Sequence, residues 1–266
     1  MELPADILAA LGGLLNATSG AILVSGPAGS GKTTLLYGCA REIVRATPGR
    51  NVVTLEDPVE IDVPGVTQSQ INVAAGFDLL TGLRSLVRQD PEVIMIGEIR
   101  DRITADVALQ ASLTGQLVMS SFHAGSAAGA LSRLLDMGIE PYVLQSGLLA
   151  VLSLRLVRRL CRCARAAAGD ELCGLPVTQA KTAVGCERCF GSGYAGRALL
   201  AEYLPIHDGR MRAGILQRAD AGALSELAVA GGMLPLRRRG ILAVEAGVTS
   251  PLEVLRVLGS GQELPW

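Results

Sequence analysis

Eight consecutive residues constrain this chain more than any other feature. They form a complete G-x-x-x-x-G-K-T phosphate-binding loop, Gly26-Pro27-Ala28-Gly29-Ser30-Gly31-Lys32-Thr33. An apolar run precedes the loop and helix-forming residues from Thr34 follow it, which is the strand, loop and helix context that the motif requires. Glycines let backbone N–H groups surround phosphates, Lys32 reaches the outer phosphates, and the Thr33 hydroxyl can ligate Mg²⁺. Because these flanks argue against an incidental glycine-rich turn, we predict nucleotide binding at residues 26–34.

Short apolar runs that end in polar residues recur along the first half of the chain. Stretches with helical spacing, such as Leu79 to Gln89, lie between them, so the pattern predicts an α/β fold with a mostly parallel sheet. A ligand of such a sheet lies beyond the carboxyl ends of its strands. The expected strands are Ala21 to Val24, Asn51 to Leu55, Val93 to Ile96 and Leu117 to Met119, and polar residues follow each of them. We therefore expect those polar residues to share one site.

Acids and a histidine stand at these strand ends. The run from Val93 to Glu98 has the form of a Walker B strand, in which Glu98 can hold Mg²⁺ or its waters. Glu56 and Asp57 point to opposite sides of their strand, so one can face a water that attacks a γ-phosphate; a solvated strand end explains them equally well. His123 can hydrogen-bond a γ-phosphate or have a structural role.

Three arginines lie close to these boxes in the sequence. Arg84 and Arg88 are four residues apart on one helix face, and Arg100 follows Glu98 closely. Arginines can stabilise the charge of phosphoryl transfer across a subunit interface. A solvated helix face and a salt bridge are an equally good explanation.

Four of the six cysteines form two pairs. Cys161-x-Cys163 and Cys186-x2-Cys189 are separated by 22 residues. Without a readable signal peptide the chain is expected to be cytoplasmic, where thiols stay reduced, so the pairs predict a tetrahedral Zn²⁺ site in a region too small for its own core. The first pair is one residue short of C-x2-C, and Cys173 can substitute; reduced structural thiols are the alternative. Cys39 is expected to be a small buried residue.

The second half of the chain is expected to be mainly helical. A helix is predicted from Leu148, with Leu149, Leu152, Leu156 and Leu160 on one face, and a last helix at Ser250, where Ser250 and Glu253 form a capping box. These patterns divide the chain into a nucleotide-binding core at 1–155, a cysteine-rich subdomain at 156–200 and C-terminal helices at 201–266.

Charge and hydropathy bear on the partners. The chain has 24 basic and 25 acidic side chains, which argues against a nucleic-acid partner. The most apolar stretch, Pro141 to Leu154, is too short to span a bilayer.

The motifs resemble one family closely, the GspE- and PilB-like ATPases of type II secretion and type IV pilus assembly. The most specific match is the run from Leu86 to Asp101, with an acidic box at Thr54 to Glu60 and a histidine box from Leu113 to His123. The resemblance covers about Leu3 to Leu258 and implies a RecA-like hexameric motor that hydrolyses ATP with Mg²⁺. It implies that Glu56 orients the water, Glu98 is the Walker B acid and His123 contacts the γ-phosphate.

The resemblance also implies partners for this chain, and the chain differs from the family's usual pattern in some places. The family works at the inner membrane through platform and anchoring proteins, and the paired cysteines resemble the zinc-bearing insertion of its assembly-type members, which retraction motors lack. Leu199 stands where the family usually has glycine. Met1 falls at the family's interdomain linker, so an N-terminal domain that supplies arginines in trans is expected to be missing. The alternative function is therefore an ATP-binding subunit or regulator that needs a separate partner for turnover.

Overall fold

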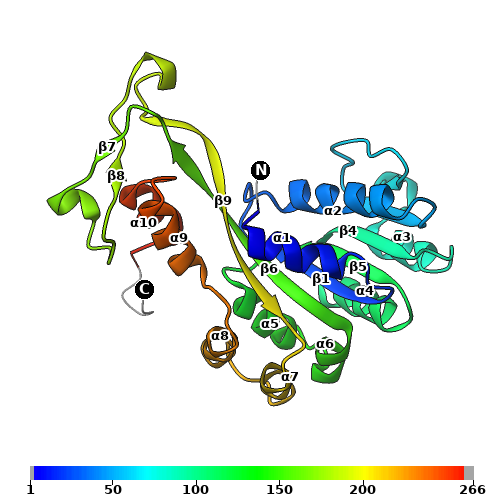
Figure 1. The fold of residues 1–266 in the computed structure, drawn as a ribbon. Coiled ribbons are helices and arrows are strands. Elements are labelled where there is room, and N and C mark those ends of the chain that lie inside the picture. Colours follow the sequence, from blue (N-terminus) through cyan, green and yellow to red (C-terminus); the bar gives the residue numbers. More distant parts are fainter. Residues whose placement is uncertain (1–2, 261–266) are drawn as a thin grey trace. The chain divides into compact units, whose positions relative to one another are not determined.

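The structure is a computed structural model that describes residues 3–260 (Figure 1). The described chain divides into two compact units. One, here called the sheet unit, comprises residues 8–153 and 203–233; the other, the cysteine unit, comprises residues 3–7, 154–202 and 234–260. The expected boundaries near residues 155 and 200 stay a prediction.

A seven-stranded sheet provides the framework of the sheet unit. Its strands follow the order β3-β2-β4-β5-β1-β6-β9, and each pairing from β3 to β6 is parallel. Strands β6 and β9 each continue from one unit into the other. The strands are β1 (Gly20–Ser25), β2 (Val52–Glu56), β3 (Thr67–Gln70), β4 (Val93–Ile99), β5 (Leu117–Phe122), β6 (Leu148–Leu160) and β9 (Tyr194–Pro205).

Helices cover both faces of this sheet. In Figure 1, α2 lies on one face and α4 to α6 lie on the other. One hydrophobic core joins the strands to the helices and includes Leu55, Ile96, Leu131 and Leu144, each almost fully buried. This arrangement buries the central strands on both faces, as their continuous apolar runs predict. The helices are α1 (Ala5–Leu14), α2 (Lys32–Ala46), α3 (Leu79–Leu86), α4 (Arg102–Leu113), α5 (Ala127–Asp136), α6 (Pro141–Gly147), α7 (Gly209–Leu216) and α8 (Ala221–Ala230).

The cysteine unit has smaller hydrophobic clusters. The short antiparallel strands β7 (Arg165–Ala166) and β8 (Lys181–Thr182) belong to it, with helices α9 (Leu236–Glu245) and α10 (Pro251–Leu258). Leu175 and Ala180 from the cysteine-rich region form one cluster with Val244 and Val254 from the two helices. The cysteine-rich region therefore shares a core with α9 and α10.

The predicted helix from Leu148 to Leu160 is wrong, because these residues form strand β6. Its leucines fit helical spacing, but Leu152, Leu154 and Leu156 also alternate with polar residues, as in a strand. The neighbouring strand β1 pairs with residues 148–153, and the segment from Ala150 to Leu154 is buried. Tertiary pairing thus overrides a local pattern that is compatible with both structures. Residues 201–205, expected to be helical, likewise belong to β9.

The predicted start of the last helix is confirmed in part. The Ser250 hydroxyl accepts a hydrogen bond from the backbone N–H of Glu253 at 3.2 Å and caps α10. The Glu253 carboxylate, however, accepts hydrogen bonds from Arg158 and Arg256 rather than from the backbone N–H of Ser250, so the second half of the expected capping box is not formed. Among residues 3–260, no helix combines the length and the apolar character needed to span a bilayer.

Candidate functional site

The phosphate-binding loop connects β1 to α2, as predicted. Strand β1 ends at Ser25, and Gly26, Gly29 and Gly31 have φ angles of 146°, 72° and 96°. Side chains with a Cβ rarely adopt this conformation, so the glycines permit the tight path of the loop. Lys32 begins α2, and its Nζ atom donates hydrogen bonds to the backbone oxygens of Gly26 at 2.9 Å and Pro27 at 3.0 Å. Lys32 is thus held in contact with the loop that is predicted to bind phosphates.

A cavity of about 510 Å³ adjoins this loop. Residues from the loop, from the ends of β2 and β4 and from the segment after β5 line it, so the polar strand ends share one site. The predicted site residues among its lining are Ala28, Gly29, Lys32, Thr33, Glu56, Glu98, Arg100 and His123. Parallel strand order explains the convergence, because β2, β4, β5 and β1 are successive neighbours with their carboxyl ends at the same edge.

Glu56, at the end of β2, is 3% exposed and accepts three hydrogen bonds. Its Oε1 atom accepts from Thr54 Oγ1 at 2.6 Å and from Gln68 Nε2 at 2.9 Å, and its Oε2 atom accepts from the Tyr37 hydroxyl. Burial and the hydrogen bond to Glu56 raise the pKa of Tyr37, which keeps the phenol protonated as a donor. The next residue, Asp57, is exposed and lines the same cavity, so the structure separates the two acids by burial: Glu56 is buried and Asp57 faces solvent.

Glu98 lies in β4 beside an irregularity that directs its side chain. The β4–β5 register shifts between Ile96 and Glu98, so Gly97 acts as the extra residue of a bulge. Glu98 Oε1 lies 2.5 Å from His123 Nε2, and Glu98 Oε2 lies 2.5 Å from Arg100 Nε. The hydrogen bond to Glu98 also raises the pKa of Arg100. Glu98, His123 and Arg100 therefore form one polar cluster at the cavity.

The three predicted arginines are placed differently. Arg100 lines the cavity, whereas Arg84 in α3 and Arg88 after it are exposed and do not line it. Asp101, next to Arg100, caps α4 by accepting from the backbone N–H of Thr104 at 2.9 Å. Of the three predicted arginines, all within the described residues, only Arg100 therefore belongs to the cavity of this chain.

Sequence reasoning missed the three donors to Glu56. Strand β3, which carries Gln68, is polar and has no apolar run that would predict it. Thr54 lies two residues before Glu56 and hence on the same side of β2, a signal that period-two alternation offers. Tyr37 lies on the first turns of α2 and is 2% exposed, although its sequence position alone does not point to β2.

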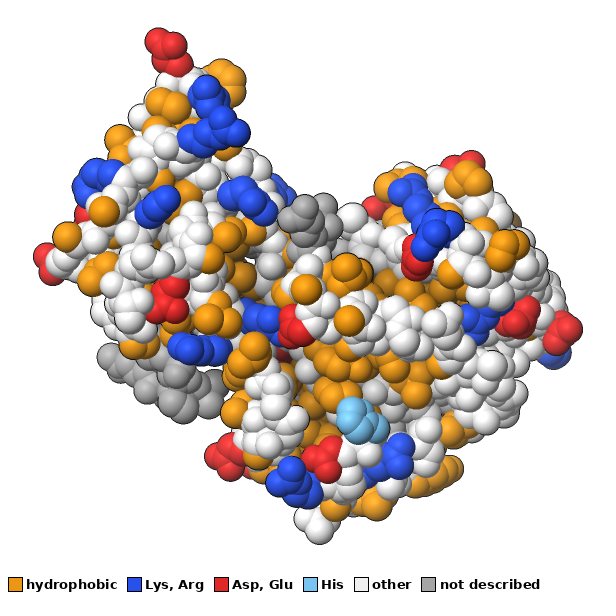
Figure 2. Space-filling view, viewed as in Figure 1, with side chains coloured by type: hydrophobic (Ala, Val, Ile, Leu, Met, Phe, Trp, Pro, Cys, Tyr) orange, Lys and Arg blue, Asp and Glu red, His pale blue; other side chains and the backbone are white. Residues whose placement is uncertain are grey.

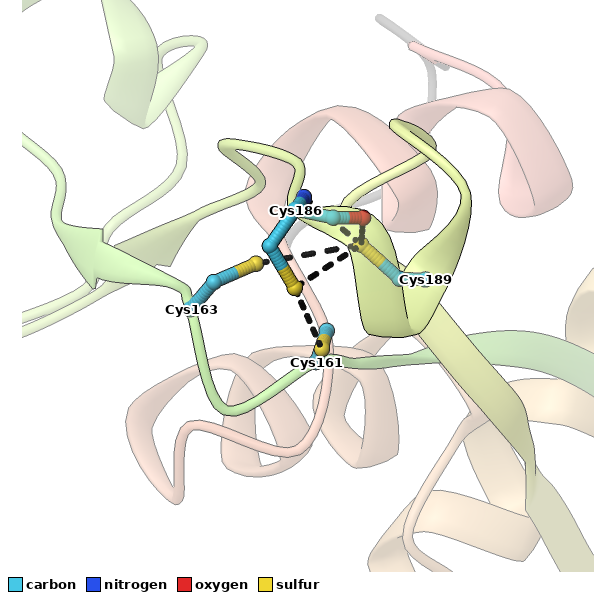
Figure 3. Close-up of side chains that lie close together, drawn as sticks. All are labelled: Cys161, Cys163, Cys186 and Cys189. Atoms are coloured by element: carbon cyan, nitrogen blue, oxygen red, sulfur yellow. Dashed lines mark hydrogen bonds between the residues drawn. The ribbon is translucent and has the colours of Figure 1, made fainter.

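The four paired cysteines lie together in the cysteine unit (Figure 3). Cys161 and Cys163 follow β6, whereas Cys186 immediately precedes the short 3₁₀ turn Glu187–Cys189 and Cys189 is its last residue. All four Sγ atoms lie within 4.8 Å of one another, with distances of 3.9 Å from Cys161 to Cys186 and 3.7 Å from Cys186 to Cys189. A tetrahedron of sulfurs about 2.3 Å from Zn²⁺ has edges of about 3.8 Å. The short C-x-C spacing therefore does not prevent a metal-like arrangement.

Hydrogen bonds from backbone N–H groups help to lower the pKa of one of these thiols, that of Cys189. Burial raises the pKa of Cys189, but hydrogen bonds from the backbone N–H groups of Cys186 at 3.1 Å and Gly193 at 3.2 Å contribute to lowering it to about 6. A thiol of this kind is readily ionised for metal binding. The other two cysteines lie outside the cluster: burial raises the pKa of Cys39 to about 12, and Cys173 is partly exposed.

Basic side chains gather on the face of the cysteine unit that Figure 2 draws. Arg159, Arg162 and Arg188 line a hollow of about 590 Å³ beside Cys161, and no acid lines it. This hollow is a local positive surface in a chain whose total charge is nearly balanced.

Sequence comparison gives relatives along nearly the whole chain. The family model described as type II/IV secretion system protein matches residues 3–256. Type II secretion system protein E of Aeromonas hydrophila is 46% identical over 254 residues, which cover 92% of this chain and 50% of that protein. The type IV pilus assembly ATPase PilB of Thermus thermophilus is 40% identical over 246 residues, 89% of this chain and 27% of that protein. The chain spans about half the length of the type II relatives that it matches.

Solved structures share the fold. The pilus retraction motor PilT with bound ADP has a TM-score of 0.73 and 24% identity, covering 99% of this chain and 67% of PilT. The ATPase DotB of Legionella pneumophila has a TM-score of 0.69 and 22% identity, covering 96% of this chain and 63% of DotB. The predicted α/β fold with a mostly parallel sheet and a cysteine cluster is thereby confirmed.

Proposed function

This chain belongs to the type II/IV secretion system protein family, and on that premise we propose that it is the ATP-hydrolysing part of a motor for type II protein secretion or type IV pilus assembly. The observation that carries the proposal is the convergence of Lys32, Glu56, Glu98 and His123 at one cavity beside the phosphate-binding loop. These residues come from separate strand ends, and together they provide phosphate contacts, a metal ligand and a base.

The residues present fit a nucleotide with Mg²⁺. Ser30, in the loop, is 3% exposed, and its hydroxyl has no hydrogen-bond partner in the described part of the chain, so it is free for a phosphate oxygen. Thr33 and Glu98 offer the hard oxygen ligands that Mg²⁺ prefers. Bound there, Mg²⁺ would neutralise charge on the transferred phosphoryl group. Residues 26–34 would hold the phosphates, with Lys32 at the outer ones.

Glu56 is proposed to orient the attacking water and to take its proton. The water oxygen forms a bond to the γ-phosphorus while the bond from that phosphorus to the ADP oxygen breaks, giving ADP and phosphate. His123 would contact the γ-phosphate beside Glu98. Arg100 would act within the site, and the exposed Arg84 and Arg88 would reach the site of a neighbouring subunit.

The cysteine cluster is proposed to hold a structural Zn²⁺ through Cys161, Cys163, Cys186 and Cys189. The sulfur distances and the hydrogen-bonded Cys189 thiol support four-coordinate binding. A zinc-bearing insertion favours secretion or pilus assembly over pilus retraction, as the resemblance implies.

We further propose a homo-oligomer, a hexamer by family resemblance, that works on the cytoplasmic side of the inner membrane. Its partners would be platform and anchoring proteins, and the hollow lined by Arg159, Arg162 and Arg188 offers a basic surface for contact with one of them. No nucleic-acid partner is proposed, because basic and acidic side chains are nearly equal in number.

The test is ATP turnover by Glu56→Gln. Removing the base while keeping the size of the side chain should lower turnover by at least about a hundred-fold, with nucleotide binding retained. Glu42→Gln, at an exposed acid of α2 paired with Arg45, is the matched control and should leave turnover unchanged. Full turnover by Glu56→Gln would refute the assignment of Glu56.

The second candidate is an ATP-binding subunit that depends on a partner for turnover. It is favoured by Arg84 and Arg88, which are exposed and do not line the cavity of their own chain, so that a second protein would supply such arginines to it. In that case the chain binds Mg-ATP tightly but hydrolyses it only when the N-terminal half of a relative is added. Turnover that is the same with and without that half would exclude this candidate.

A further inference from the structure

We propose that Tyr37, Thr54 and Gln68 are positioning residues that hold the Glu56 carboxylate in the orientation from which it acts on water. The inference rests on the proposed function, in which Glu56 orients the water for ATP hydrolysis. None of the three residues lines the cavity, whereas Glu56 does. Each would therefore influence the reaction indirectly, through Glu56 or through the segment that follows it.

The three donors approach the carboxylate from different elements. Thr54 lies directly opposite Gln68 in the β2–β3 register, and Glu56 lies two residues farther along β2 on the same side. Their donor atoms lie 2.6 and 2.9 Å from Glu56 Oε1. The Tyr37 hydroxyl reaches Oε2 from α2, the helix that the phosphate-binding loop opens. The carboxylate is thus fixed from two strands and one helix.

The number of donors matches what a base needs. An ionised carboxylate has about four lone-pair positions. Thr54 and Gln68 occupy two on Oε1, and Tyr37 occupies one on Oε2. One position on Oε2 is left, which is enough to accept one hydrogen bond from a water. The donors would therefore orient Glu56 without using up its capacity to accept a proton.

Two of the donors also fasten the segment that follows Glu56. The Tyr37 hydroxyl accepts from the backbone N–H of Glu60 at 3.0 Å, and Gln68 Oε1 accepts from the backbone N–H of Val63 at 2.7 Å. Among the described residues, the Thr54 hydroxyl contacts Glu56 and no other hydrogen-bond partner. Thr54 therefore gives the cleanest test, because its replacement disturbs the carboxylate without releasing this segment.

The experiment compares Thr54→Val with Thr54→Ser in the full chain. Valine keeps the shape but removes the donor, and serine keeps the donor. We expect T54V to lower kcat about ten-fold, because a misplaced catalytic group loses rate steeply. KM and the dissociation constant of a fluorescent ATP analogue should change less than about two-fold, since ground-state binding does not involve Glu56. T54S should recover most of kcat.

A double-mutant cycle separates positioning from a merely structural role. In the Glu56→Gln background the group that Thr54 positions is gone, so adding T54V should lower the single-turnover rate by less than about two-fold. Tyr37→Phe should follow the same pattern. The positioning role is overturned if T54V keeps the kcat of the unsubstituted chain while E56Q is impaired. It is also overturned if T54V lowers the rate as much in the E56Q background as in the unsubstituted chain. If E56Q itself turns over ATP fully, the proposed function of Glu56 fails first, so the two failures are distinguishable.

Discussion

The cavity beside residues 26–33 and the cysteine cluster are both proposed ligand sites, but the chain builds them in different ways. The cavity lies where neighbouring parallel strands end, and a large hydrophobic core holds those strands in place. The cysteine cluster lies on loops after β6 and around residues 186–189, in a unit with smaller hydrophobic clusters. In the first site the fold positions the ligand-binding groups before any ligand arrives. In the second, we expect the ligand to help hold the fold.

This difference predicts unequal responses to metal removal, the largest effect expected. A chelator, or Cys186→Ser, should lower the free energy of unfolding of the cysteine unit by about 5 kcal/mol, because ligation of zinc is also folding energy. Binding of an ATP analogue to the sheet unit should hold within about two-fold. Hydrogen exchange read separately over residues 161–197 and 20–56, with elemental analysis for zinc, measures both.

Cys173→Ser is the matched control for this experiment, since Cys173 is a partly exposed thiol of the same region outside the cluster. It should retain the metal and the protection of the unsubstituted chain. If purified protein without zinc shows full protection from hydrogen exchange over residues 161–197, the cysteine unit does not need a ligand to hold its fold. The two sites would then not differ in this respect.

A second contrast concerns pH, through a buried acid of the cysteine unit. Glu253 is fully buried and accepts hydrogen bonds from Arg158 at 2.7 Å and Arg256 at 2.7 Å. Burial alone would raise the pKa of Glu253, but the two arginines and the backbone N–H of Arg158 lower it to about 2. A folded-state pKa below the unfolded value of 4.5 means that the contribution is complete above pH 4.5 and is lost as pH falls toward 2.

We therefore expect Glu253→Gln to cost about 2 kcal/mol of unfolding free energy at pH 6, because it replaces a buried charged acceptor of two partly exposed arginines with a neutral amide. The difference between the unsubstituted chain and E253Q should shrink between pH 6 and pH 3. Glu187→Gln, at an exposed acid of the same unit, is the control and should change little at either pH. A difference that stays constant with pH would contradict this account of Glu253.

The two regions also differ in what their sequences predict. The residues that line the proposed nucleotide cavity could be predicted from the sequence. Each of their motifs follows an apolar run, and a parallel sheet brings the ends of its strands together. The register could not be predicted, and polar β3 offers no apolar signal, so the donor Gln68 could not be found in advance. Thr54 could have been found, because period-two alternation places it on the same side of β2 as Glu56. Strand β6 was misassigned because its leucine spacing suits a helix as well as a strand, and only pairing with β1 decides between them.

The smallest effect expected is at two matching helix caps, one in each unit. Ser250 caps α10 by accepting from the backbone N–H of Glu253 at 3.2 Å, and Ser126 caps α5 by accepting from that of Gly129 at 3.0 Å. Serine-to-alanine changes at such caps cost about 1 kcal/mol. Ser250 also forms a 2.7 Å hydrogen bond with the Tyr194 hydroxyl, a contact for which Ser126 has no counterpart in the described part of the chain.

Ser250→Ala should therefore cost slightly more than Ser126→Ala, and Tyr194→Phe should reproduce only the excess. Local hydrogen exchange at α10 and at α5 measures each effect where it arises. Because the metal and the cap would support the same small unit, removal of zinc should reduce the further cost of Ser250→Ala and leave that of Ser126→Ala as it is. If Ser250→Ala lowers the free energy of unfolding by the same amount with zinc as without it, as Ser126→Ala should, the cysteine unit keeps its packing without its ligand.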